Sequence, residues 1–192
     1  MKQFKKSIVL LILLCMGAVG AYAQSNRGTL SASTVFRPLN GDGEASWPKA
    51  KIGASLKKSG FTLESETQKE GYSLGVQETL HTKVYKKGNC SVEYTFFWYG
   101  ENPFFTSLKI KFPTIEACEK FYKEVVKRVE ADWDYWHDVN TPIWGTFPGE
   151  WTYKKNKCER TCFGEGAASN QFWKCEGKTF TYTYKEIPIE GL

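Results

Sequence analysis

The sequence predicts an α+β fold: an antiparallel sheet of about six strands, with a short N-terminal helix and one long amphipathic helix packed on one face. Two observations predict it. Several segments alternate apolar and polar residues between turn residues, which is typical of strands. One long stretch instead repeats its apolar residues every three or four positions, which is typical of a helix. The order helix, four strands, helix, two strands favours an antiparallel sheet with its helices on one side.

The first helix is predicted over residues 48–59. Pro48 suits the first turn of a helix and Gly60 suits the position just after the last turn. Four strands are expected next, over residues 61–67, 79–86, 90–99 and 105–112. Gly88-Asn89 and Gly100-Glu101-Asn102-Pro103 separate the last three of these strands, which indicates an antiparallel meander.

The long helix is the strongest element in the sequence. Thr114 is its candidate N-cap, and Asn140-Thr141-Pro142 should end it. Its apolar stripe consists of Ile115, Cys118, Tyr122, Val125, Val129, Trp133 and Trp136. Two further strands are predicted over about residues 150–159 and 171–185, joined by a turn-rich segment.

The first residues have the pattern of a secretory signal peptide. Lys2, Lys5 and Lys6 precede an apolar run, and Ala21-Tyr22-Ala23 forms a small-x-small cleavage site before Gln24. We therefore expect residues 1–23 to be removed near Ala23–Gln24 and the mature chain to be secreted or periplasmic. The apolar run is shorter than the 20 or so residues of a membrane span, and no later segment supplies one, so no transmembrane segment is expected in the mature chain.

The remaining chain is predicted to hold one domain. Residues 24–46 are rich in Ser, Gly and Asn and are expected to be a flexible lead-in, followed by a single domain over residues 47–192. Loss of the three N-terminal lysines lowers the formal net charge from +5 to +2. This near balance argues against nucleic acid as a partner.

Five cysteines follow the signal peptide, which in an oxidising compartment favours two disulfides and one free thiol. Cys118 is the expected free thiol, because it lies on the apolar face of the long helix. A turn centred on Gly166-Ala167 would place Cys158 opposite Cys175. We therefore expect a Cys158–Cys175 bridge, and Cys90–Cys162 as the second.

The sequence offers little for catalysis, because it contains only two histidines. Cys118 and His137 are nineteen residues apart on one predicted helix, hence roughly 28 Å apart, and cannot form a nucleophile–base pair. His81 is expected to be an ordinary strand residue. No glycine-rich phosphate loop follows a strand. We expect no enzyme, and a hydrolase with an unrecognised site stays as an alternative.

Metal binding is also not expected. Asp132, Asp134, His137 and Asp138 gather at the end of the long helix, but such a cluster is more often a solvated patch. Cys158, Cys162 and Cys175 have a spacing that disulfides explain better than zinc in a secreted chain. No cofactor is predicted.

Aromatic residues are the main functional signal, and they crowd into two regions. In Phe96-Phe97-Trp98-Tyr99 both faces of a predicted strand are aromatic, and residues 133–151 combine many rings with Pro and Gly. Trp133, Trp136 and Trp151 could simply complete the core. The expected binding residues are Phe97, Tyr99, Trp136, Trp144, Phe147 and Trp151. They predict a secreted binding protein, most simply one that recognises a protein partner; stacking on a glycan is the alternative.

Overall fold

The structure, a computed structural model, describes residues 30–39, 47–73, 76–138, 147–154, 156–164 and 167–187. For residues 73, 76, 132–138, 147–154, 160–164, 167–169, 186 and 187 it describes the backbone alone. The predicted signal peptide and its cleavage point lie outside these ranges. Within them, no helix has the length and apolar character needed to cross a membrane.

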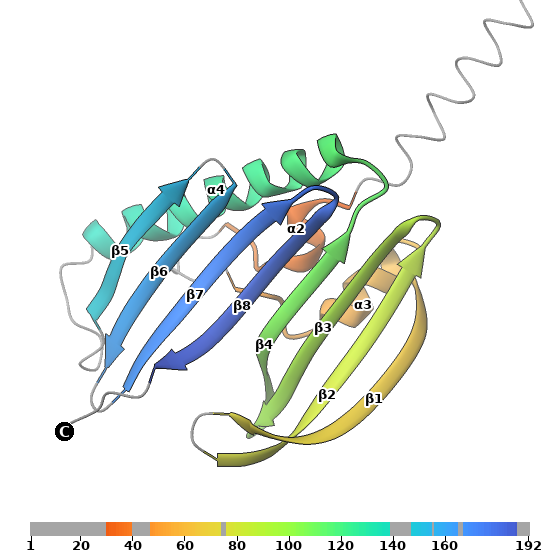
Figure 1. The fold of residues 1–192 in the computed structure, drawn as a ribbon, viewed down its shortest axis with the longest axis horizontal. Helices are drawn as coiled ribbons and strands as arrows, with labels where there is room; N and C mark the ends of the chain where they lie inside the picture. The colour runs from red at the N-terminus through yellow and green to blue at the C-terminus, as the bar shows by residue number, and fades with distance from the viewer. Residues whose placement is uncertain are drawn as a thin grey trace, which may run out of the picture.

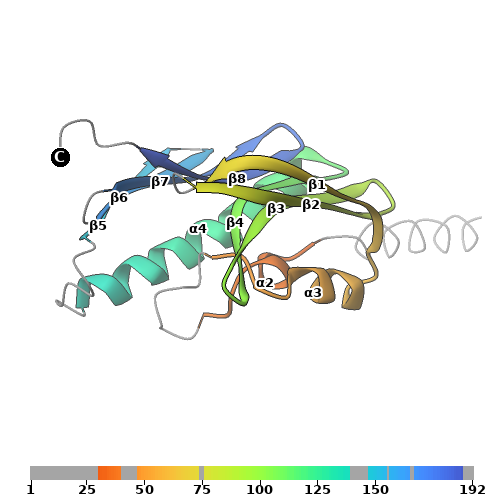
Figure 2. The ribbon, with the colours of Figure 1, turned by 90° about the horizontal axis from the view of Figure 1, so that it is seen from below.

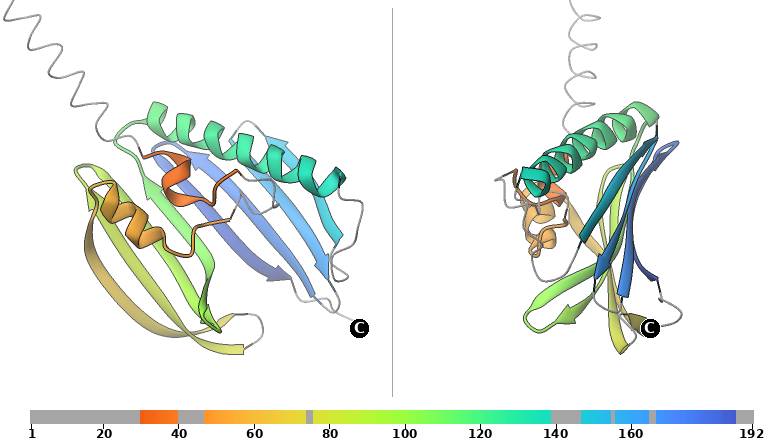
Figure 3. Two further views of the ribbon diagram at one scale, coloured as in Figure 1. Left: turned by 180° about the vertical axis from the view of Figure 1, so that it is seen from behind. Right: turned by 90° about the vertical axis from the view of Figure 1, so that its left-hand side faces the viewer.

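The described residues form one antiparallel sheet with three helices on one face (Figures 1, 2 and 3). The strand order is β1-β2-β3-β4-β8-β7-β6-β5. The helices are α2 (Ala32–Val35), α3 (Ile52–Lys58) and α4 (Ile115–Asp138). The strands are β1 (Thr62–Ser73), β2 (Val76–Lys87), β3 (Cys90–Tyr99), β4 (Asn102–Lys111), β5 (Phe147–Lys154), β6 (Lys157–Gly164), β7 (Ala167–Glu176) and β8 (Thr179–Ile187). The predicted antiparallel sheet with helices on one face is therefore confirmed.

The described part of the sheet has eight strands, so the predicted count of about six is wrong. Each of the two segments predicted as a final strand contains a hairpin. The segment 150–159 crosses the turn between β5 and β6, and the segment 171–185 crosses the turn between β7 and β8. At the second turn Gly177 has a φ of 55°, a conformation that glycine adopts at little cost.

The sheet consists of two similar halves. Each half is a four-stranded meander that follows a helix in the sequence: β1–β4 follow α3, and β5–β8 follow α4. The final strands of the two meanders, β4 and β8, pair antiparallel at the centre of the sheet (Figure 1). The turns before these two strands are alike: Gly100 and Gly177 have positive φ values of 60° and 55°. The two meanders are thus arranged in opposite directions about the β4–β8 pair.

The core lies between the sheet and the helices, and residues 30–37 belong to it. Phe36 is fully buried, with its ring 6.3 Å from Phe121 of α4 and 6.3 Å from Phe180 of β8. Leu30, Ala32 and Val35 are buried beside it. The prediction that residues 24–46 are a flexible lead-in is therefore wrong for this part, because its apolar side chains fill the space under the sheet.

Polar contacts hold this segment to α4. The Ala32 N–H and the Ser31 hydroxyl donate to the Glu124 carboxylate at 2.9 and 3.1 Å. Glu124 therefore accepts a hydrogen bond from the first N–H group of α2, which has no partner within the helix. The buried Arg128 guanidinium donates to the Arg37 carbonyl at 2.6 Å. These contacts supply partners for charged groups that burial would otherwise penalise.

Helix α4 matches its prediction in position and, over residues 118–129, in its buried face. For Trp133 and Trp136, the last residues of the predicted stripe, the structure describes the backbone alone. Thr114 accepts a hydrogen bond from the Ala117 N–H at 3.2 Å, as expected of an N-cap. The buried stripe consists of Cys118, Phe121, Tyr122, Val125 and Val129. Ile115, the first residue of the predicted stripe, is instead about half exposed.

The predicted disulfide pairing differs from the structure. Gly164 pairs with Ala167, so the β6–β7 turn lies one position earlier than expected, and Cys158 consequently faces Trp173 rather than Cys175. Cys175 lies against Cys118, the predicted free thiol, with the two Sγ atoms 2.6 Å apart. Cys90 and Cys162 sit on strands four sheet positions apart, roughly 19 Å, which excludes a bridge between them.

Candidate functional site

The tip of the β3–β4 hairpin leaves the plane of the sheet. Pairing of β2 with β3 ends at His81 and Phe96, and pairing of β4 with β8 ends at Ser107 and Thr183. Between β3 and β4 the register shifts next to Thr95, which bends the hairpin. Figure 2 shows its tip turned toward the helices, away from the β1–β2 hairpin on one side and β8 on the other.

One face of this tip packs toward β8. The Phe97 ring lies 5.1 Å from Phe104, which in turn lies 4.9 Å from Tyr184 and 6.3 Å from Trp47. Phe97 is 1% exposed. The expectation that Phe97 belongs to an exposed binding face is therefore wrong, because its ring fills the space where β4 and β8 separate.

The opposite face of the tip lines a groove of about 330 Å³ between α3 and strands β2 to β4. We call it the aromatic groove. Its rings form a continuous series, with centroid separations of 6.0 Å for Tyr85–Tyr94, 6.0 Å for Tyr94–Phe96 and 5.4 Å for Phe96–Trp98. Trp98 ends the series and is 51% exposed. The remaining lining residues are Ala50, Lys51, Ile52, Gly53, Ala54, Lys57, Lys83, Pro103 and Phe105.

Gly53 allows α3 to approach the inner end of this series. A Cβ atom at this position would lie 2.6 Å from the Tyr85 hydroxyl oxygen and 2.9 Å from the Tyr94 hydroxyl oxygen. The two tyrosine rings are stacked at an interplanar angle of 11° and are buried. Burial, and then the neighbouring Tyr85, raise the pKa of Tyr94 above its usual range, so its hydroxyl stays protonated. The floor of the groove is therefore neutral and closely packed against α3.

The charged residues of the aromatic groove are lysines. Lys51 and Lys57 lie on the α3 side, and Lys83 on the β2 side lies 5.9 Å above the Phe96 ring. Lys83 also forms an ion pair with Glu66 at 3.0 Å, whereas no acidic residue is among the described residues that line the groove. An apolar surface bordered by positive charge results.

His81 lies beside the open end of the same series. Its ring stacks on Phe96 with centroids 5.2 Å apart and an interplanar angle of 20°, and it lies 6.5 Å from Trp98. His81 is therefore part of an aromatic stack, which extends the apolar surface from β3 onto β2.

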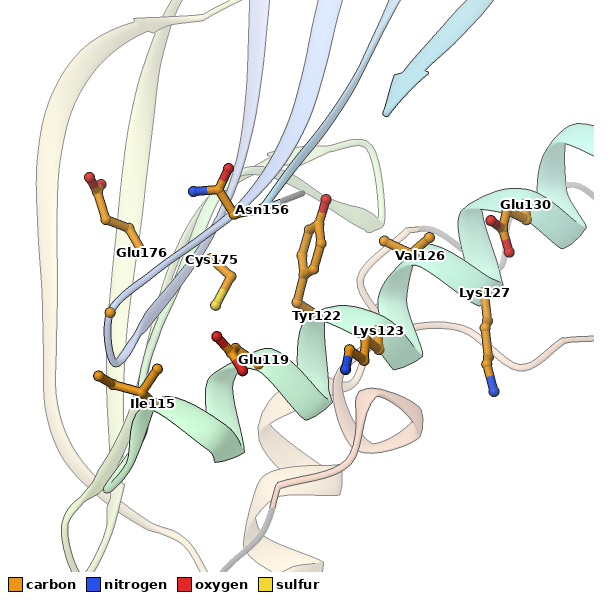
Figure 4. Close-up of a pocket in the computed structure, with 11 residues that line it drawn as sticks. Ile115, Glu119, Tyr122, Lys123, Val126, Lys127, Glu130, Asn156, Cys175 and Glu176 are labelled. Atoms are coloured by element: carbon orange, nitrogen blue, oxygen red, sulfur yellow. The ribbon is translucent and has the colours of Figure 1, made fainter. Parts of the chain in front are cut away.

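A second, larger groove of about 840 Å³ lies between α4 and the ends of the β5–β6 and β7–β8 hairpins. Figure 4 shows Tyr122 extending from α4 toward the strands, with Lys127 directed away from them. The larger groove is lined by charged residues of both signs: Glu119, Lys123, Lys127, Glu130 and Glu176. This mixed lining does not single out one class of ligand. No group of three or more potential metal ligands occurs among the described side chains.

The predicted binding residues fall into three groups in the structure. Tyr99 is 70% exposed at the hairpin tip, next to Trp98, and Phe97 is buried. Only the backbone is described for Trp136 of α4 and for Phe147 and Trp151 of β5, and Trp144 lies outside the described residues. The side chains of Asp132, Asp134, His137 and Asp138 are likewise not described.

The sequence analysis places Trp98 in an aromatic run but does not include it, or the α3 residues beside it, among the expected binding residues. Trp98 alternates with Tyr94 and Phe96 along β3, and this period of two was the available signal that they share a face. The contribution of α3 had no comparable signal, since Gly53 was expected only as a helix residue. Comparison with known proteins finds no family model, no curated protein and no solved structure that matches this chain.

Proposed function

We propose that this chain is a secreted, non-enzymatic binding protein that recognises a protein partner through the aromatic groove. The observation that carries the proposal is Trp98, a large ring that is half exposed and rests on a buried series of rings. Exposed aromatic residues with rigid support are typical anchors of protein interfaces. Tyr99, exposed at the same hairpin tip, enlarges this surface.

The lining of the aromatic groove specifies the chemistry of the partner. Its apolar floor favours an aromatic or aliphatic side chain, and Lys51 and Lys57 favour carboxylates next to that side chain. The groove volume of about 330 Å³ accommodates one or two side chains, not a folded domain. The proposed ligand is therefore an exposed segment of a protein in which an apolar residue is flanked by Asp or Glu.

Carbohydrate binding is the second candidate, because the exposed Trp98 ring could also stack on a sugar. A sugar site normally adds carboxylates and amides that bind hydroxyl groups. The described lining of the aromatic groove contains lysines but no Asp, Glu, Asn or Gln. The lining thus favours a protein partner over a glycan.

Two features support the absence of catalysis in this proposal. The ionisable residues that line the groove are three lysines and two tyrosines, and Tyr94 keeps its proton. His81 stacks on Phe96 and is not next to a nucleophile among the described contacts. Such a site can bind a ligand but lacks a matched acid and base.

A peptide selection tests the proposal. The mature protein would be used to select from a randomised peptide library displayed on phage, with a parallel selection on Trp98→Ala as the control. We expect enriched peptides that carry an apolar residue beside Asp or Glu. Enrichment of peptides that bind Trp98→Ala equally well, or of basic peptides, would contradict the proposed groove.

A parallel titration with soluble polysaccharides, followed by tryptophan fluorescence, tests the second candidate. A saturable shift that requires Trp98 would assign the groove to glycans instead.

A further inference from the structure

We propose that Cys118 and Cys175 form a disulfide in the mature protein, which joins the first turns of α4 to the end of β7. The pairing rests on the proposed secretion of the chain, since an oxidising compartment is where such a bond persists. The sequence alone favours Cys158 as the partner of Cys175 and leaves Cys118 free.

The two thiols already lie against each other. The Sγ atoms are 2.6 Å apart, and both cysteines are buried on the face of the sheet that α4 covers. Cys118 begins the buried stripe of α4, and Cys175 lies on β7 in line with the buried Trp173. Joining them needs no movement of the helix relative to the sheet, which distant cysteines would require.

The reaction needs an oxidant, which we assign to the class of dithiol–disulfide oxidants found outside the cytoplasm. One cysteine, as thiolate, attacks the disulfide of the oxidant and forms a mixed disulfide; the second thiolate then displaces the oxidant. Cys118 and Cys175 together lose two protons and two electrons, and the oxidant disulfide is reduced to two thiols. No other co-reactant is required.

The surroundings of the pair set when this reaction occurs. Burial raises the pKa of Cys118 and of Cys175, so few thiolates are present in the folded protein. The bond should therefore form during folding, before α4 closes on the sheet. For the same reason a reductant should reach the finished bond slowly.

The proposed bond constrains a large part of the chain. It closes a loop between positions 57 residues apart in the sequence, which includes the end of α4 and strands β5 and β6. Cys175 also lines the larger groove described above, with Glu119 and Tyr122 of α4 (Figure 4). The bond would hold the two walls of this groove together.

Trypsin provides a direct test, because cleavage after Lys and Arg puts each mature cysteine on a separate peptide. The full chain would be exported, alkylated without reduction, digested and analysed by mass spectrometry. We expect residues 112–120 linked to residues 175–178, 2 Da lighter than the sum of the two thiol peptides. Alkylation of both cysteines, or linkage of Cys175 to another peptide, would overturn the pairing.

Refolding in vitro separates the pairing from the cellular location. Reduced protein would be refolded with oxidised glutathione and mapped in the same way. A Cys118–Cys175 link here, together with an intact N-terminus in cells, would overturn secretion and keep the pairing. Absence of the link in both samples would overturn the pairing and leave the groove proposal unaffected.

Thermal unfolding measures the effect of the bond. Closing a loop of this length should make the melting temperature of the oxidised protein about 10 °C higher than that of the reduced protein. Cys118→Ala should abolish this difference, whereas Cys90→Ala, which also removes a buried thiol, should retain it. Equal differences in both variants would contradict the assignment.

Discussion

Trp98 meets Phe96 edge to face, with ring centroids 5.4 Å apart and planes at 87°. The two residues lie on the same face of β3, yet Phe96 is buried and Trp98 is half exposed. The transition occurs where the β3–β4 hairpin leaves the sheet, so the exposed ring rests on the core. Such support reduces the entropy lost when a partner packs against Trp98.

The exposure of Trp98 predicts its response to a soluble quencher. Trp98→Phe should remove a larger share of acrylamide-accessible emission than Trp173→Phe, because Trp173 is fully buried in the core. Steady-state quenching of the wild type and both variants measures this. If the two variants lose equal accessible emission, Trp98 is shielded in solution and cannot serve as an anchor.

Reversing the charge of single lysines on α3 distinguishes the effect of a lysine that lines the groove from that of its neighbour. Lys57→Glu should weaken binding of an acidic selected peptide by about tenfold and slow its association, because the lysine lines the aromatic groove. Lys58→Glu, an adjacent exposed lysine outside that lining, is the matched control and should have a small effect. Association rates of the peptide with both variants, measured at low and high salt, test this difference. An equal loss of affinity in Lys57→Glu and Lys58→Glu would indicate a diffuse charge effect and contradict a specific role of Lys57.

Gly53→Ala should distort the groove. The added methyl would lie 2.6 Å from the Tyr85 hydroxyl oxygen, and we expect this close contact to lower the unfolding free energy by about 1–3 kcal/mol. The higher helix preference of alanine offsets part of this loss. Tyr85→Phe removes the closest atom and should restore part of this loss in the double variant. Urea unfolding of the two single variants and the double variant completes the cycle. Strict additivity would contradict the contact.

Alkaline pH should destabilise the protein through Cys90. Burial raises the pKa of this thiol to about 11, although Lys87 opposes the rise. The folded state therefore favours the protonated thiol: its contribution is fully present below pH 9 and is lost as the pH rises from 9 to 11, up to about 2 kcal/mol. Urea unfolding of oxidised wild type and Cys90→Ala measures it. Parallel curves for the two proteins would show that Cys90 does not titrate this way.

Much of the fold could be predicted because its strongest elements are periodic. Helix α4 and strand β3 match their predicted positions, since a long apolar stripe and a bounded alternating segment each leave little choice of structure. The sequence predicts a single strand in place of each of the hairpins β5–β6 and β7–β8, because the residues between their strands include no Asn-Gly or Asp-Gly pair. Apolar and polar residues alternate on both sides of such a turn, which conceals it.

Parts of the site depended on tertiary structure and could not be predicted. Phe97 and Trp98 are neighbours in an aromatic run, and only the bend of the hairpin decides that Phe97 is buried and Trp98 exposed. The expected disulfide failed for a similar reason, because a turn centre moved by one position changes the facing residue by two. Residues 30–37 were expected to be flexible because their few apolar side chains gain burial only once α4 and the sheet are in place.

The affinity of a selected acidic peptide for the wild type, Trp98→Ala and Tyr72→Ala, measured by isothermal titration calorimetry, tests the proposed function most directly. Tyr72 is also a largely exposed ring, on the β1–β2 hairpin and outside the aromatic groove, and serves as the matched control. We predict at least a tenfold loss for Trp98→Ala, about 1.4 kcal/mol, and no change for Tyr72→Ala. Equal affinity of all three proteins would contradict recognition through the aromatic groove.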